Sequence, residues 1–186
     1  MGQYYRIIRK EYNKKAEVFN RSLKGGDYVM AKLLEHSWWG NKTCLAVSAT
    51  LVDTPAKLCW VGDYAEEEEC QALGFTMDLV WGEPDQSVEL DPAPEVFTLD
   101  SFKFLVNHDK KQFVDLPKYK EASMMKGGWC IFPISLLTAL GNGRGGGDYH
   151  KEDDLVGSWA FDTIEITNDP TKVEGFEEIE PVFRED

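Results

Sequence analysis

The chain has 186 residues, of which 42% are hydrophobic and 12% are aromatic. This length and composition exclude a disordered protein and favour one folded domain with a sizeable core. The formal net charge of −13 argues against direct binding to nucleic acid or to anionic membranes, because both attract lysine and arginine. We expect a protein partner, and a basic one suits this charge, although solubility alone also explains an acidic surface.

Neither a secretory signal nor a membrane span is evident. The first residues, MGQYYR, lack an apolar region, and no stretch approaches 18 apolar residues. The cysteines show no CxxC pair and no spacing typical of metal ligands, so we expect buried, reduced thiols. They are Cys44, Cys59, Cys70 and Cys130. The sequence therefore predicts a cytoplasmic protein with no membrane association, no metal site and no cofactor.

Short elements are predicted in the first quarter of the chain. Residues 4–9 and 15–20 are rich in β-forming residues and are expected to pair as a hairpin. Residues 29–36 have the apolar spacing of a short helix. Asn41 is expected to cap a second helix that extends to about residue 52.

The next segment predicts a strand followed by a helix. Residues 57–62 form an apolar run typical of a buried strand. Asp63 and Glu66 have the spacing of a helix-capping pair, which places the acidic run 66–69 in the first helical turn. We interpret this run as a solvated helix start and not as a metal site.

In the second half, the segment 82–95 is rich in proline and acids and is the only candidate domain boundary. Residues 103–108 and 112–116 predict a hairpin, with His108 exposed near its turn. Residues 129–132 predict a buried strand, and Pro133 is expected to start a helix that extends to Leu140.

Residues 155–160 and 161–167 are expected to be strands, the second because apolar and polar residues alternate along it. Together these patterns predict an α+β fold over residues 1–186. We expect a single domain, mainly an antiparallel sheet with a few short helices.

The glycine-rich segment 141–150, GNGRGGGDYH, is the strongest candidate for a binding site. Its glycines allow close approach of the backbone to a ligand. It is preceded by a predicted helix and not a strand, which excludes a dinucleotide-binding fingerprint, and no Lys-Ser or Lys-Thr follows, which excludes a P-loop. The segment is expected to present polar side chains, namely Asn142, Arg144, Asp148 and His150.

Two interpretations of this segment stay open. Arg144 has the chemistry to bind a carboxylate or phosphate, and Asp148 with His150 would suit acid–base chemistry. Alternatively, Asp148 caps a turn, Arg144 pairs with a neighbouring acid, and His150 is simply exposed. The same alternatives hold for His36, which is either a structural residue or part of a site.

Two further residues complete the candidate set. Trp38 belongs to a tandem tryptophan pair, which is typical of a core or an interface. Asp162 follows the VGSWA segment and would approach the glycine-rich segment if the chain doubled back. Its position near the start of a strand does not establish that contact.

The chain resembles a family of uncharacterised bacterial and bacteriophage-encoded proteins. The shared motifs are MGQYY at the start, KLLEHSWWGN at 32–41, WVGDYA at 60–65, LVNHDKK at 105–111, GNGRGGGDYH at 141–150 and VGSWA at 156–160. The resemblance implies a shared fold and an origin in a phage or mobile element. It implies no activity. Looser relatives carry Trp-Ala-Gly-Asp where this chain has Phe161 in place of the glycine.

The function that these observations favour is non-enzymatic binding or regulation of a protein partner. The acidic charge and the abundance of aromatic residues support this hypothesis. The alternative is a small hydrolase or transferase whose site lies around residues 141–150 and includes His36. A nucleic-acid mimic, in which clustered acids imitate phosphates, is a third hypothesis.

Overall fold

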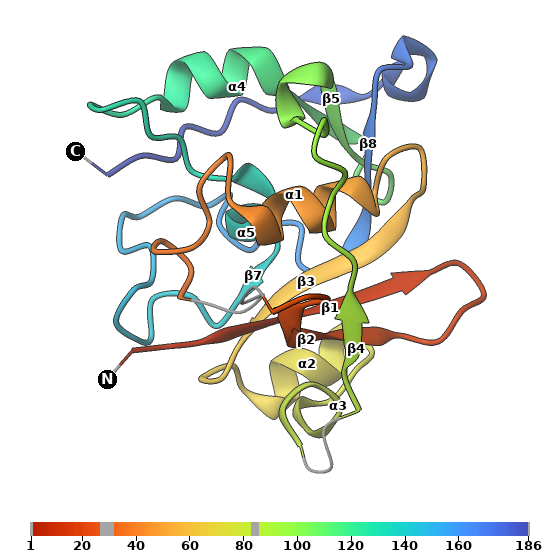
Figure 1. Ribbon diagram of the computed structural model, residues 1–186, viewed down its shortest axis with the longest axis vertical. Helices are drawn as coiled ribbons and strands as arrows, with labels where there is room; N and C mark the ends of the chain where they lie inside the picture. The colour runs from red at the N-terminus through yellow and green to blue at the C-terminus, as the bar shows by residue number, and fades with distance from the viewer. Residues whose placement is uncertain (1, 27–31, 83–85, 186) are drawn as a thin grey trace.

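Figure 1 shows a computed structural model of the protein, which describes residues 2–26, 32–82 and 86–185. The strands are β1 (Tyr5–Glu11), β2 (Glu17–Leu23), β3 (Ala56–Gly62), β4 (Val88–Leu90), β5 (Phe104–Asn107), β6 (Gln112–Asp115), β7 (Ala139–Leu140), β8 (Asp162–Thr167) and β9 (Glu177–Glu178). The helices are α1 (Lys42–Ala49), α2 (Glu67–Leu73), α3 (Met77–Trp81), α4 (Leu116–Ser123) and α5 (Pro133–Leu137), with 3₁₀ turns η1 (Leu99–Ser101) and η2 (Pro170–Val173).

All of these strands belong to one sheet. Its order is β4-β2-β1-β3-β8-β5-β6-β9, and β7 pairs with β3 beside this path. The neighbouring strands in the stretch β2-β1-β3-β8-β5-β6 are all antiparallel. In contrast, β4 pairs in parallel with β2, β7 with β3, and β9 with β6. The predicted α+β class, mainly antiparallel with short helices, is confirmed.

The central strands are buried on both faces, and this is why β3 lacks the alternation of a surface strand. Ile7 and Leu58 face the larger core, which also contains residues of α1 and α5. Ile8 and Cys59 face a second core, to which α2 contributes Cys70 and α3 contributes Val80. Helices therefore cover both faces of β1 and β3, as Figure 1 shows.

Several predicted elements are present with small shifts in their ends. The hairpin of β1 and β2 forms around a turn in which Asn13 has φ of 56°. The hairpin of β5 and β6 has Lys111 at φ of 53°. Asn41 caps α1 by accepting hydrogen bonds from the backbone of Thr43 and Cys44. The helix ends at Ala49, because Thr50 bonds back to Val47 instead of continuing the helical ladder.

Two predicted helix boundaries and one predicted helix are wrong. The capping residue of α2 is Glu66, whose partner is Glu69, and not Asp63, which instead accepts a hydrogen bond from the Tyr4 N–H. Residues 32–36 form a turn and not a helix, and residues 29–31 lie outside the described part of the chain. The helix from Pro133 ends at Leu137, because residues 139 and 140 pair with β3 as β7.

Two predicted strands are turns or loops. Residues 129–132 make only an isolated bridge, in which Ile131 pairs with Trp38. Residues 155–160 fold into consecutive turns, and the N–H groups of Gly157 and Trp159 bond to carbonyls of α5. Most of their apolar residues are buried or half-buried in loops, and the pattern alone does not distinguish strand from turn there.

The segment 82–95 contributes to the same sheet as the N-terminal strands. Within it, β4 pairs with β2, with Val88 opposite Phe19 and Leu90 opposite Leu23. Among the described residues, no helix is long and apolar enough to cross a membrane.

Trp159 offers a direct test of the larger core. Its side chain has no exposed surface, and its Nε1 donates a hydrogen bond to Gln112 Oε1 at 3.0 Å. Trp159→Ala is expected to lower the free energy of unfolding by about 3–5 kcal/mol, because it leaves a large cavity. Denaturant unfolding measures the change.

The matched control is Trp129→Ala, since 54% of Trp129 is exposed. This variant is expected to lose less than about 1 kcal/mol. Equal losses in the two variants would contradict the placement of Trp159 in the core.

Candidate functional site

Residues 141–150, called the glycine loop from here on, fold around one buried carboxylate. Oδ2 of Asp148 accepts hydrogen bonds from the backbone N–H groups of Gly143, Arg144 and Gly145 at 2.8, 2.9 and 3.0 Å. Oδ1 accepts a fourth from the Tyr5 hydroxyl at 2.9 Å. Asp148 is only 1% exposed. These four donors compensate its charge for the loss of water.

The glycines of the loop are required by the close passage of the N-terminal segment. Gln3 donates its N–H to Gly146 O at 3.0 Å, and its side chain is buried. A Cβ at Gly145 would lie 2.4 Å from Gln3 Cβ, and one at Gly62 would lie 1.8 Å from Gln3 Nε2. Gly141 and Gly143 also adopt positive φ values of 87° and 89°. The loop is therefore shaped around its own chain.

Asn142 closes the loop on itself. Its side-chain oxygen accepts from the Tyr149 N–H at 2.9 Å, and its amide nitrogen donates to the Tyr149 carbonyl at 2.8 Å. The Tyr149 ring is buried and packs edge-on against Phe183, with 5.8 Å between the centroids. Asn142 thus has a structural role that links the two ends of the loop.

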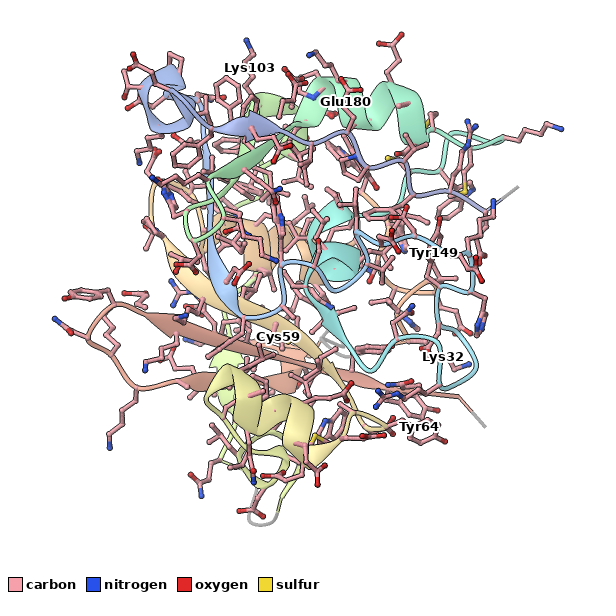
Figure 2. All side chains as sticks on the ribbon, turned by 180° about the vertical axis from the view of Figure 1, so that it is seen from behind. Lys32, Cys59, Tyr64, Lys103, Tyr149 and Glu180 are labelled. Atoms are coloured by element: carbon pink, nitrogen blue, oxygen red, sulfur yellow. The ribbon has the colours of Figure 1, made fainter. Side chains whose placement is uncertain are left out.

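Arg144 pairs with α2. Its guanidinium makes two hydrogen bonds to the Glu69 carboxylate, at 2.6 and 2.8 Å, and a third to the Tyr64 carbonyl at 2.9 Å. The hydrogen bonds from Arg144 lower the pKa of Glu69, and those to Glu69 raise the pKa of Arg144. Figure 2 shows Tyr64, Lys32 and Tyr149 along one side of the molecule.

Burial also affects Tyr5, which links the glycine loop to β1. Burial and the adjacent Asp148 carboxylate both raise the pKa of the Tyr5 hydroxyl, so it is protonated and donates throughout the neutral range.

In the part of the chain that the structure describes, no hydrogen bond joins the remaining candidate residues to this carboxylate. His36, Trp38 and His150 are exposed, the first two in the segment before α1. Asp162, in β8, accepts a hydrogen bond from Asn107 at 2.8 Å and lies 3.7 Å from Lys110 Nζ. The structure therefore brings together three of the predicted residues, Asn142, Arg144 and Asp148.

The chemistry left to the glycine loop is limited. Both carboxylate oxygens of Asp148 accept hydrogen bonds from within the chain, and the side chain is only 1% exposed, whereas a general base or a metal ligand must be within reach of a substrate or an ion. In the described part of the chain, no group of three or more His, Cys, Asp and Glu residues is placed to hold a metal ion.

A second buried carboxylate lies on β8 and was not expected from the sequence. Glu165 is fully buried, and its Oε2 lies 2.6 Å from His108 Nε2. Its other oxygen pairs with Lys172 of η2. The expectation that His108 is merely exposed is therefore wrong. The alternation along 161–167 predicted the strand, but it did not indicate the partners of Glu165, which come from His108 and from η2.

Phe161 has a backbone that its residue type rarely adopts. Its φ is 58°, in the left-handed region that favours glycine, which is the residue that looser relatives are expected to have here. Its buried ring packs edge-on against Phe75, with 4.9 Å between centroids. Burial of the ring in the second core offsets the strain at this position.

Exposed aromatic residues gather where the segment 37–39 meets the turn after α4. Trp38 is 37% exposed and Trp129 is 54% exposed, and their rings meet edge to face at 5.6 Å. Met124, 37% exposed, lies in the same turn. Trp38, Met124 and Trp129 are called the aromatic patch below.

Two cavities adjoin the aromatic patch. One of about 420 Å³ is lined by Met125, Lys126, Trp129 and Glu185. The other, of about 310 Å³, includes Trp39, Phe102 and Met124 in its lining. Backbone hydrogen bonds from Trp39 N–H to Cys130 O and from Met125 N–H to Trp129 O, each 2.7 Å, fix this surface.

The chain matches no protein-family model, and comparisons with curated proteins and with solved structures give no significant match. The resemblance to bacterial and bacteriophage proteins therefore stays a prediction.

Removal of the Asp148 carboxylate tests whether it organises the glycine loop. Asp148→Ala leaves the three loop amides and the Tyr5 hydroxyl without their acceptor. We expect the free energy of unfolding to fall by about 3 kcal/mol, since unsatisfied buried donors are costly. Asp154→Ala is the control, because Asp154 is exposed, and it should change stability by less than about 0.5 kcal/mol. A small effect at Asp148 would contradict a structural role.

The ion pair of Arg144 and Glu69 predicts a pH-dependent stability. The pKa of Glu69 is lower in the folded protein than its ordinary value of 4.5. The pair therefore stabilises the fold above pH 4.5, and this contribution is lost as the pH falls through the folded-state pKa. Arg144→Met is expected to lower the free energy of unfolding by about 1 kcal/mol at pH 7, because the pair is about one-third exposed, and by less at pH 3.

Denaturant unfolding at the two pH values measures this difference. Lys15→Met removes one positive charge from an exposed position in the β1–β2 turn and serves as the control. An Arg144→Met loss of the same size at pH 3 and pH 7 would show that pairing with Glu69 is not its origin.

Proposed function

We propose that this is a non-enzymatic binding or regulatory protein that engages a basic protein partner through the aromatic patch. The observation that carries the proposal is the exposed pair of Trp38 and Trp129. Tryptophan is enriched among the residues that dominate binding energy at protein interfaces. Two large apolar rings in contact with water are otherwise unfavourable, and a partner that covers them gains by their burial.

The surroundings of the aromatic patch suit a partner side chain. The two adjoining cavities, of about 420 and 310 Å³, flank the turn that carries Met124 and Trp129. Methionine side chains adapt to different partner shapes. A segment with an apolar anchor would therefore fill one cavity while its neighbours cover the aromatic rings.

The charge of the chain favours a basic partner. The net charge is −13, and the linings of the cavities beside the patch contain three acidic residues, Asp100, Glu121 and Glu185, against two lysines, Lys120 and Lys126. Lysine and arginine around an apolar anchor would complement this surface and accelerate association. By the same argument, direct binding to nucleic acid is not part of the proposal.

The alternative, a hydrolase or transferase at the glycine loop, has less support. Such an enzyme needs acid–base groups that are free and converge on a cleft. Asp148 and Arg144 instead bond to the backbone, Tyr5, Tyr64 and Glu69.

Origin and location complete the proposal. A phage or mobile-element origin rests on the resemblance of the sequence motifs. A cytoplasmic location fits the four free cysteines, all of which are buried.

Substitution of the two tryptophans tests the proposed surface. The wild-type protein, Trp38→Ala and Trp129→Ala are immobilised, and lysate of the host cell is passed over each at low and moderate salt. A protein captured by the wild type is then purified and its Kd is measured. Each substitution is expected to weaken binding by about thirtyfold, the size typical of an interface hot spot.

Tyr12→Ala is the matched control for an exposed aromatic residue. Tyr12 is 89% exposed in the β1–β2 turn, on the opposite side of Figure 1 from the turn after α4. The control is expected to bind like the wild type. Capture of no specific protein, or equal binding by the control and the tryptophan variants, would contradict the proposal.

A further inference from the structure

A cavity of about 320 Å³ lies at the end of the sheet where β1 turns into β2 and β3 begins. Its lining contains three lysines and one glutamate, an excess of positive charge in a chain whose net charge is −13. The charged residues are Lys10, Lys14, Lys57 and Glu11. This concentration of cations distinguishes the cavity from the others described above.

Strand pairing places two of these lysines directly opposite each other. Lys10 of β1 is the register partner of Lys57 of β3, two residues beyond the pair of Ile8 and Cys59. Both side chains therefore point to the same face of the sheet, the face of the second core. Like charges in such a pair are unfavourable unless a counter-charge lies between them.

No counter-charge from the described part of the chain neutralises the pair. Glu11 lines the cavity, but its carboxylate already pairs with Lys14 and with Arg9, and these partners lower its pKa. None of the carboxylates in the described residues forms a salt bridge with Lys10 or Lys57.

Lys57 is held in place by an uncharged partner. Its Nζ lies 5.5 Å above the centre of the Phe161 ring and donates to the Phe161 carbonyl at 3.4 Å. Phe161 therefore supplies both its ring and its carbonyl to the same ammonium. Thr163 of β8, the register partner of Lys57 on its other side, also lines the cavity.

From this arrangement we infer that the cavity binds a small dianion of the phosphate type. The cross-strand pair of Lys10 and Lys57 carries two positive charges, and a phosphate monoester carries nearly two negative charges at neutral pH. Lysine binds phosphate as a point charge. The hydroxyl of Thr163 and the amide of Asn13 supply further hydrogen-bond donors in the lining.

The size and the remaining walls favour a phosphate group with a small organic part. A volume of about 320 Å³ is at the lower end for small-molecule sites. Tyr12, Pro55 and Ala56 provide an apolar wall beside the cations. This site is separate from the aromatic patch, so it adds a small-molecule ligand to the proposed binding protein.

Nuclear magnetic resonance titration with inorganic phosphate and with glycerol phosphate tests the inference. Chloride at the same ionic strength is the reference. Both phosphates are expected to shift the backbone amide signals of residues 10–14, 56–57 and 163 with saturation, whereas chloride is not. Absence of a saturating phosphate-specific shift at these residues would overturn the inference.

Substitution of the opposed lysines provides the second arm. Lys10→Met and Lys57→Met should each weaken phosphate binding by about tenfold or more, since each removes a charged hydrogen-bond donor. Without phosphate, Lys10→Met should be at least as resistant to heat as the wild type, because the substitution relieves repulsion.

Lys15→Met is the matched control, with the same change in charge in the adjoining β1–β2 turn but outside the cavity lining. It should bind phosphate like the wild type. Equal weakening by Lys15→Met would show that only the overall charge matters and would overturn the site. A Lys10→Met variant that keeps full phosphate affinity would do the same.

Discussion

The hydrogen bonds to the buried carboxylate of Asp148 hold the glycine loop against β1. One oxygen gathers three consecutive backbone amides, and the other holds the hydroxyl of Tyr5. A negative charge at this depth is tolerated only with a full set of donors. The glycine loop, β1 and, through Arg144, α2 are therefore fixed relative to one another by one side chain. Loop and sheet are expected to form cooperatively.

Sequence patterns predicted the elements whose structure is decided locally. The hairpins of β1 with β2 and of β5 with β6 follow from segments of β-forming residues on either side of a turn, and the Asn41 cap follows from its side chain. The patterns failed at 129–132 and 155–160, where the apolar residues other than Trp129 are buried or half-buried in turns that pack against distant segments. The burial of Glu165 was equally inaccessible, because His108 and Lys172 come from other elements.

The candidate sites likewise divide into features that are local in sequence and features that depend on distant residues. The glycine loop was identified because its composition is unusual, but the sequence left open whether Arg144 and Asp148 face a ligand or their own chain. That choice depends on Tyr5 and Glu69, which lie far away in sequence. The pairing of Lys10 with Lys57 was invisible, because opposition across strands depends on register. Trp38 was identified, but its contact with Trp129 required the fold.

The two edge strands of the sheet, β4 and β9, affect whether copies of this protein associate with one another. β4 has 3 residues and β9 has 2, and each carries an exposed glutamate at an edge of the sheet. Exposed edge strands can pair with those of another molecule and, at high concentration, form fibrils. Short edge strands that carry negative charge repel one another and have few free backbone amides for such pairing. A wide sheet is thus compatible with a protein that stays dispersed in a crowded solution.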